Sequence, residues 1–416
     1  MASGSTRVTR HAPQLAAATG AFTLLCWLGA GPAAYGAPAD GAPTPLPSSS
    51  ATAPALRLPV MPSLLDPTRS PCTRASGTVM PAVPWAQDSL GLTRAHQLTS
   101  GAGVTVAVID TGVSRTAPEL AGRVGAAGTA GQDCVGHGTF IAGIIAAASA
   151  PGSGFGGVAP AARILAERGI GADGGPDPAR VAAGIRQATD AGARVIDVSL
   201  AFPATTNALT SAVRYAAAHD VLVVAAGVPD DLELTSGATD DVPKVPFWPA
   251  AQTGVLSVVD VDIDGARPDG AVDPVRADLA APGQGITGIG PSGRGHFLGN
   301  GPSIAAAFTS GAAALLRAYR PELTAPEVAA RLLAAAYPAP VPRLDPYAAL
   351  SAVLPAGPAA TVPDATAAIH LHPVVEDRTP ARRAYAILGG AALVALVLAA
   401  AALLRRKRRP GEAAGA

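Results

Sequence analysis

The sequence predicts an α/β protein with a doubly wound parallel sheet flanked by helices. Two observations predict this fold class. Short runs rich in Val, Ile and Ala alternate with longer segments of helical periodicity, and the runs have the continuous apolar character of strands that are buried on both faces. Strands spaced by amphipathic helices form a parallel sheet, because each helix returns the chain to the edge where the next strand starts.

The elements are expected from residue 104 onwards. Strands are expected over 104–109, 163–167, 195–200, 221–226 and 255–261. Helices are expected over 139–148, 178–191, 208–219, 303–319 and 325–336. The core is expected to close near Leu350. Ligands of such sheets bind beyond the carboxyl ends of the strands, so functional residues are expected at that edge.

The N-terminal segment has the pattern of a secretory leader. Arg7 and Arg10 precede a mostly apolar stretch, and Ala34 and Gly36 have the spacing that a signal peptidase site requires. We therefore expect residues 1–36 to be a signal peptide; the alternative is an uncleaved anchor. Residues 37–71 are rich in Pro and Ala and are expected to be an extension, either a linker or an arm that wraps the surface.

The C-terminal segment has the pattern of a membrane span. Residues 385–404 form an uncharged apolar run of about one bilayer-spanning helix, and five consecutive basic residues follow it. Basic residues stay on the cytoplasmic side, so the bulk of the chain is expected outside and residues 405–416 inside. A buried core helix is the alternative. Residues 351–384 are Pro- and Ala-rich and are expected to form a stalk.

The charge of the central part argues against a nucleic-acid partner. The chain has 30 basic and 30 acidic residues, but two arginines belong to the leader and five basic residues to the tail. Without these residues and Glu412, 23 basic and 29 acidic residues remain. Binding to phosphates requires a basic patch, and this part of the chain carries none.

The cysteines agree with an oxidising compartment. Cys26 leaves with the leader, and the remaining Cys72 and Cys134 can form one disulfide. Two thiols without further Cys or His at ligand spacing do not predict a metal site, and no cofactor is expected.

Three short segments carry the chemistry of a nucleophilic site. Asp110 ends a predicted strand, His137 opens a predicted helix and Ser303 opens the long Ala-rich helix. A serine hydroxyl needs a neighbouring base, and the base needs an orienting carboxylate. Each segment alone has a plain structural alternative, such as a helix-start turn or a cap. The chain order Asp, His, Ser matches the subtilisin arrangement and excludes the chymotrypsin and α/β-hydrolase orders.

The segments VAVIDTGV, GHGTFIAGIIAA and NGPSIAAAFTSGAAALL resemble the three signatures of the subtilisin-like serine proteases over about residues 95–350. This resemblance implies a subtilisin-like peptidase domain over 72–350 with Asp110, His137 and Ser303 as catalytic triad. It also implies a substrate cleft lined by two segments, DVSLA and AAG. The residues carried over to that cleft are Ser199, Leu200, Ala201 and Gly227.

The leader, the Pro-rich arm, the cysteine pair and the C-terminal basic tail narrow the resemblance to the mycosins, the membrane-anchored subtilisin-like proteases associated with type VII secretion. The resemblance implies a Cys72–Cys134 disulfide and an extracytoplasmic endopeptidase acting on proteins or peptides. It also implies association with the membrane complex of type VII secretion. The alternative function is a catalytically impaired scaffold subunit of that complex.

The sequence departs from the family at the oxyanion hole. Subtilisins carry Asn directly after the AAG segment, where this chain has Val228, and Pro302 stands where family members usually have Thr. Losing one oxyanion donor costs on the order of 10²–10³ in turnover, so we expect low activity that relies on the Ser303 backbone N–H. The acidic segment 228–246 is expected to be a solvated surface loop; the alternative is a loop that folds back and supplies Thr235 or Ser236 as donor.

Overall fold

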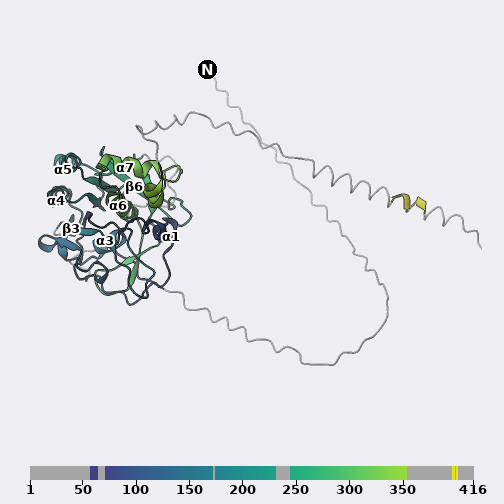
Figure 1. The fold of residues 1–416 in the computed structure, drawn as a ribbon, viewed down its shortest axis with the longest axis horizontal. Helices are drawn as coiled ribbons and strands as arrows, with labels where there is room; N and C mark the ends of the chain where they lie inside the picture. Colours follow the sequence, from purple (N-terminus) through teal and green to yellow (C-terminus); the bar gives the residue numbers. More distant parts are fainter. Residues whose placement is uncertain are drawn as a thin grey trace, which may run out of the picture. The chain divides into compact units, whose positions relative to one another are not determined.

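The structure is a computed structural model that describes residues 57–63, 71–171, 174–230, 244–353, 396–398 and 400–401 (Figure 1). The expected signal peptide, most of the N-terminal extension, the stalk, most of the expected span and the basic tail lie outside these residues.

A seven-stranded parallel sheet forms the centre of the fold, with the strand order β2-β3-β1-β4-β5-β6-β7. Its strands are β1 (Thr105–Asp110), β2 (Val124–Ala126), β3 (Arg163–Arg168), β4 (Val195–Val198), β5 (Leu222–Ala226), β6 (Val255–Val261) and β7 (Leu279–Pro282). The order changes direction at β1, which pairs with β3 on one side and β4 on the other. A crevice at the carboxyl end of β1 is the ligand site that this topology predicts.

Helices cover both faces of the sheet. α3 (His137–Ala146) and α6 (Pro302–Tyr319) pack together on one face, and α4 (Pro178–Asp190) and α5 (Asn207–Ala218) lie side by side on the other (Figure 1). The side chains of β1 alternate between these layers: Val106 and Val108 pack with α3 and α6, whereas Ala107 and Ile109 pack with α4 and α5. The strand is therefore buried on both faces, as its apolar run predicts.

The remaining elements are short. They are the helices α1 (Trp85–Ser89), α2 (Leu92–Ala95), α7 (Ala325–Ala334) and α8 (Pro346–Ser351), the 3-10 helices η1 (Pro118–Leu120) and η2 (Gly128–Gly131), and an antiparallel hairpin of β8 (Ile286–Ile289) and β9 (His296–Gly299). The N-terminal arm lies along β9, because the Met61 N–H donates to the Leu298 carbonyl at 2.7 Å and the Leu298 N–H donates to the Pro59 carbonyl at 2.8 Å.

The predicted doubly wound sheet is confirmed, and the predicted strand over 255–261 has the same bounds as β6. α3 begins at His137, two residues earlier than predicted, and β4 ends at Val198, two residues earlier than predicted. β2, β7, the β8–β9 hairpin and the helices α1, α2, α8, η1 and η2 were not predicted. Each of them has three to six residues, which is too few for a hydrophobic period to stand out.

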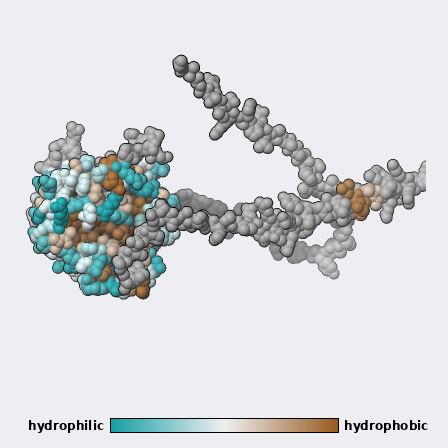
Figure 2. Space-filling view, turned by 90° about the horizontal axis from the view of Figure 1, so that it is seen from above, coloured by the Kyte–Doolittle hydropathy of each residue, from teal (hydrophilic) through white to brown (hydrophobic). Residues whose placement is uncertain are grey.

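Within the part of the chain that the structure describes, no helix is long and apolar enough to cross a membrane. The described residues of the expected span include Leu396, Val397 and Leu398, which are helical and 60–68% exposed. Figure 2 shows the apolar residues in brown; on the globular part they are scattered among hydrophilic ones.

Candidate active site

The three residues predicted as a triad meet at the carboxyl end of β1. Asp110 is the last residue of that strand, His137 is the first residue of α3 and Ser303 is the second residue of α6. His137 Nδ1 lies 2.8 Å from Asp110 Oδ2, and His137 Nε2 lies 3.3 Å from Ser303 Oγ. These separations are those of a carboxylate–imidazole–hydroxyl relay, in which the imidazole is held at one nitrogen and accepts at the other.

The ionisation of this pair follows from burial and from mutual attraction. Burial opposes the charged form of His137, but the carboxylates of Asp110 and Asp230 together outweigh it and hold the pKa of His137 well above its usual range. Burial alone would raise the pKa of Asp110. The charge and hydrogen bond of His137, with hydrogen bonds from Ser199 and Thr111, outweigh this effect, so the pKa of Asp110 is lowered. The pair is therefore favoured as an imidazolium–carboxylate ion pair in the free protein.

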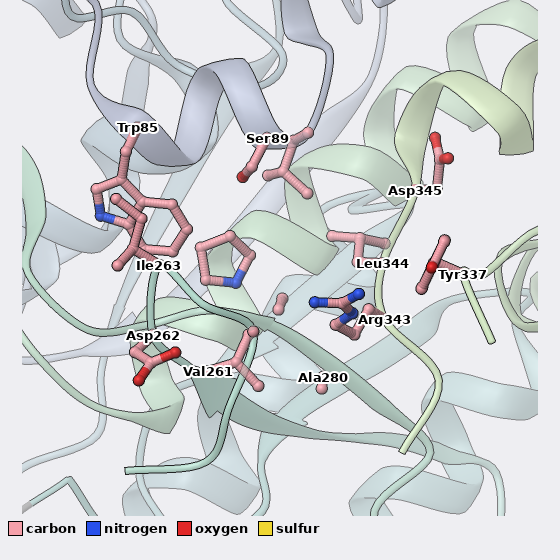
Figure 3. A pocket seen from close by; sticks show the side chains of 14 residues that line it. Trp85, Ser89, Val261, Asp262, Ile263, Ala280, Tyr337, Arg343, Leu344 and Asp345 are labelled. Atoms are coloured by element: carbon pink, nitrogen blue, oxygen red, sulfur yellow. The ribbon is translucent and has the colours of Figure 1, made fainter. Parts of the chain in front are cut away.

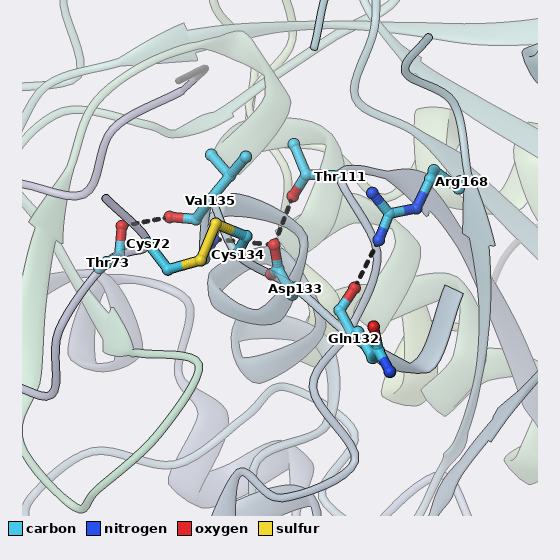
Figure 4. The surroundings of a disulfide bond; sticks show 9 residues. Cys72, Thr73, Thr111, Gln132, Asp133, Cys134, Val135 and Arg168 are labelled. Carbon is cyan, nitrogen blue, oxygen red and sulfur yellow. Dashed lines mark hydrogen bonds between the residues drawn. A yellow bond between two sulfur atoms is a disulfide. The ribbon is translucent and has the colours of Figure 1, made fainter. Parts of the chain in front are cut away.

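A buried carboxylate, Asp133, fixes the turn that presents His137. Asp133 Oδ1 accepts from the Thr111 hydroxyl at 2.9 Å and from the Gly136 N–H at 2.8 Å, and Oδ2 accepts from the Thr139 N–H and hydroxyl (Figure 4). The Thr111 hydroxyl in turn accepts from the Gly138 N–H at 3.0 Å. Because Thr111 follows Asp110 directly, this network ties the end of β1 to the start of α3.

A disulfide joins Cys72 to Cys134, as the resemblance implies (Figure 4). Cys134 lies between Asp133 and the turn that leads to His137. The Thr73 N–H donates to the Cys134 carbonyl at 2.9 Å, and the Thr73 hydroxyl donates to the Val135 carbonyl. The N-terminal arm is therefore bonded to the segment that positions His137.

A second buried carboxylate, Asp197, lies behind Asp110 on the neighbouring strand β4. The Ser310 hydroxyl of α6 donates to Asp197 Oδ1 at 2.6 Å, and the Ser199 hydroxyl lies 3.4 Å from Oδ2. Burial raises the pKa of Asp197 to about 7. Ser199 also hydrogen-bonds Asp110 and lowers its pKa. The hydroxyl of Ser199, directly after β4, thus favours the ionised form of Asp110.

A third carboxylate, Asp230, contacts both Ser303 and His137 directly. The Ser303 N–H donates to Asp230 Oδ1 at 2.9 Å, and the Ser303 hydroxyl donates to Oδ2 at 2.6 Å. Oδ2 also lies 3.2 Å from His137 Nε2, and the Asp230 side chain is only 8% exposed. The expectation of a solvated surface loop over 228–246 is wrong for Asp230. The signal in the sequence was its position two residues after the departure at Val228.

The other predicted site residues lie near the ends of β4 and β5. Val228 is buried in a small apolar cluster with Phe247 and Val272, and Ala201 packs against the same cluster. Leu200 belongs to the core on the α4–α5 side of the sheet, and the Gly227 N–H donates to a backbone carbonyl of β6 at 2.7 Å. Thr235 and Ser236, the alternative donors, lie outside the described residues.

A separate pocket is lined by α1, by the ends of β6 and β7 and by residues between 337 and 345, and no triad residue lines it. Trp85, Ile263, Tyr337 and Arg343 are among its walls (Figure 3). In the described ranges, no three His, Cys, Asp or Glu side chains are grouped as a metal site requires.

The profile of the subtilase family matches residues 101–366. Among characterised relatives, Mycosin-3 of Mycobacterium tuberculosis is 35% identical, with an alignment that covers 76% of this chain and 82% of the relative. Subtilisin BL of Lederbergia lenta is also 35% identical and covers 58% of this chain and 86% of its own.

Solved structures give the same result. The serine protease MycP1, described as an essential component of the type VII (ESX-1) secretion system, superposes with a TM-score of 0.59 at 30% identity and covers 72% of this chain and 96% of its own. A chain of the periplasmic assembly from the ESX-5 inner membrane complex superposes with a TM-score of 0.59 at 28% identity, covering 70% of this chain and 90% of its own.

Proposed function

We propose, from the premise that this chain belongs to the subtilase family and within it to the mycosins, that it is a membrane-anchored extracytoplasmic serine endopeptidase. The observation that carries the proposal is the continuous relay from Asp110 through His137 to Ser303, with separations of 2.8 and 3.3 Å. Hydrolysis of a peptide bond by a serine nucleophile uses these three groups in contact, and this mechanism requires no metal or cofactor.

In the proposed reaction, Ser303 Oγ attacks the carbonyl carbon of the scissile peptide bond. His137 Nε2 accepts the hydroxyl proton and returns it to the departing amine, while Asp110 holds the proton on Nδ1 and stabilises the imidazolium. Ser199, Leu200, Ala201 and Gly227, near the ends of β4 and β5, are proposed to border the peptide. The acyl-enzyme is then hydrolysed by water through the same relay.

The oxyanion of the tetrahedral intermediate has one backbone donor in this proposal, the Ser303 N–H in the first turn of α6. A helix N-terminus suits a developing negative charge, because its free N–H groups point outward. Val228 replaces the side-chain amide of the family and is turned into an apolar cluster, so it supplies no second donor. This supports slow turnover relative to subtilisins.

We also propose the cell membrane as location and the type VII secretion complex as partner. The mycosin relatives support both, since MycP1 and a chain of an ESX-5 assembly share this fold. The proposed organisation is a signal peptide over 1–36, an extension over 37–71, the peptidase domain over 72–350, a stalk over 351–384, a transmembrane helix over 385–404 and a cytoplasmic tail over 405–416.

A specific observation favours a second candidate function, that of a scaffold subunit of the secretion complex. The carboxylate of Asp230 occupies the position on Ser303 that a substrate oxyanion would take. A subunit that serves only in assembly of the complex needs no free oxyanion position, so it would tolerate the Asp230 carboxylate at Ser303.

The test of the proposed function is labelling of the purified full-length chain with a fluorophosphonate probe, which reacts with an activated serine. We expect slow labelling of the wild type and none of Ser303→Ala, because the nucleophile is removed. Ser351→Ala is the matched control: Ser351 is an exposed serine that donates to a backbone carbonyl of α8, and its loss should leave labelling unchanged. Labelling that persists in Ser303→Ala would contradict the assignment of the nucleophile.

A further inference from the structure

The Asp230 carboxylate makes the contacts that a cleaved peptide would make. Hydrolysis of a peptide bond leaves a carboxylate, whose two oxygens lie against the nucleophile and its backbone N–H. Asp230 Oδ1 is 2.9 Å from the Ser303 nitrogen, within the range of about 2.7–3.1 Å expected between a donor and an oxyanion. Oδ2 is 2.6 Å from Ser303 Oγ.

We infer that Asp230 is a fourth residue of the catalytic centre, which holds that centre in a closed, product-like state and must turn away before a peptide carbonyl can bind. The inference rests on the proposed function, because it assigns a role to Asp230 in the same reaction. This inference is separate from the replacement of the oxyanion-hole Asn by Val228. That replacement removes a donor, whereas Asp230 places an anion at the oxyanion position in the free protein.

Three features of the contact make the closed state unreactive. The Ser303 N–H is already used by a carboxylate oxygen, so it is not free for the substrate. The Ser303 hydroxyl is 0.7 Å closer to Asp230 Oδ2 than to His137 Nε2, at 2.6 and 3.3 Å, so its proton is directed away from the base. His137 lies between two carboxylates, at 2.8 Å from Asp110 and 3.2 Å from Asp230, and is favoured in the protonated form that cannot accept a proton.

The local structure fits both a closed and an open position of Asp230. Gly301 leaves room for the closed position, because a Cβ atom there would lie 2.3 Å from Asp230 Oδ1. A cavity borders Asp230, with Asp260, Arg267 and Asp269 among its walls. Arg267 forms an ion pair with Asp260; its Nε donates no hydrogen bond within the described residues and lies 3.8 Å from Asp273 Oδ1. We expect the released carboxylate to turn into this cavity.

The charge of Asp230 also bears on the base. The carboxyl groups that act on the His137 side of the centre are Asp110 at the end of β1, Asp133 before α3, Asp197 on β4 and Asp230 after β5. The Asp230 carboxylate lies 3.2 Å from His137 Nε2, and Asp260 and Arg267 line the cavity that borders Asp230. Asp230 contributes to the raised pKa of His137, so removal of its charge makes the imidazole lose its proton at lower pH.

The experiment compares the labelling rate of the full-length chain by a fluorophosphonate probe between pH 5 and pH 9 for wild type, Asp230→Ala and Asp230→Asn. We expect both variants to label at least about tenfold faster at pH 7, which corresponds to a closed-state preference of about 1.4 kcal/mol. The acid limb of the rate profile should move to lower pH in both. Asp264→Asn, which removes the same charge from an exposed residue outside the cavity, should behave as wild type.

The two proposals fail in different ways. Wild type that labels, with Asp230 variants that label no faster and keep the same pH profile, would overturn the role of Asp230 alone. Silence of the wild type and of both variants, in proteins with unchanged thermal unfolding temperature, would overturn the proposed protease function and this inference with it. Ser303→Ala in the Asp230→Ala background must abolish any gain, since the gain is assigned to Ser303.

Discussion

Buried aspartates surround the His137 imidazole, and each has different hydrogen-bond donors and charges around it. Asp110 is ionised by its contact with His137, Asp133 accepts from four donors at the turn, and Asp197 is held by hydroxyl groups with a pKa of about 7. Asp230 contacts the nucleophile itself. Residue type alone therefore does not assign a role; the number and charge of the donors around each carboxylate do.

Asp197 makes the stability of the protein depend on pH. Its pKa is 3.8 in an ordinary environment and about 7 in the fold, so between these values the folded state binds a proton that the unfolded state has lost. The free energy of unfolding should therefore fall as pH rises from about 4 to about 7. Asp197→Asn keeps hydrogen-bonding groups and removes this dependence. We expect it to be more stable than wild type at pH 8, by roughly 1–3 kcal/mol, and to differ little at pH 4.

Urea unfolding of both proteins at pH 4 and pH 8 measures this difference. Asp264→Asn, at an exposed aspartate, serves as the matched control and should follow wild type at both pH values. A stability difference between wild type and Asp197→Asn that is the same at both pH values would contradict the assignment of the proton to Asp197.

The positions of the triad residues could be predicted from the sequence, because each lies in a local motif whose element boundary is visible. Asp110 ends a β-branched run, and His137 and Ser303 follow glycine-containing turns. The contact of Asp230 with Ser303 could not be predicted, since it joins residues 73 positions apart without any local pattern. The orientation of Val228 into an apolar cluster depends on Phe247 and Val272, which the sequence does not place beside it.

At the scale of elements, the start of α3 is the most constrained part of the site. The Asp133 network fixes its first turn, and Gly138 allows the close approach of β1, because a Cβ atom at Gly138 would lie 2.0 Å from the Gly112 carbonyl oxygen. Met61 of the arm lies against Gly136 from the outside: a Cβ atom at Gly136 would lie 3.0 Å from the Met61 sulfur. The helix is thus held from the sheet, from the preceding turn and from the arm.

Removal of the disulfide should destabilise the protein without changing the core. The bond closes a loop between residues separated by 62 positions. Restricting such a loop in the unfolded chain is worth about 2–5 kcal/mol. We expect Cys72→Ser combined with Cys134→Ser to lower the free energy of unfolding by that amount in a urea titration. Wild type treated with reductant should match the double variant, and a further loss in the double variant upon reduction would contradict this account.

Elements of ten or more residues were predicted to within two residues at nearly every end, because their periodicity is sustained. The β8–β9 hairpin and α1, α2 and α8 were missed. Some of the contacts that hold them are distant in sequence: the arm residue Met61 and β9, for example, are more than 200 positions apart. Short elements of this kind are determined by tertiary contacts more than by their own sequence.

At the scale of the whole molecule, the described fold closes at α8, and the residues beyond it are proposed to anchor the protein in the membrane. The proposed span over 385–404 predicts that the full-length chain sediments with membranes and resists extraction by alkaline carbonate. A chain that ends at residue 384 should appear in the soluble extracytoplasmic fraction and keep its labelling at Ser303. Recovery of the full-length chain in the soluble fraction would contradict the proposed anchor.

The bond between Cys72 and Cys134 also decides what a protease can remove from this molecule. A cut anywhere between residues 73 and 133 leaves both fragments joined, so a nicked chain would migrate as one species until it is reduced. Only a cut before Cys72 releases the preceding residues. Maturation at the N-terminus is therefore limited to the first 71 residues, and Cys72 marks the boundary between what the protein can shed and what it must keep.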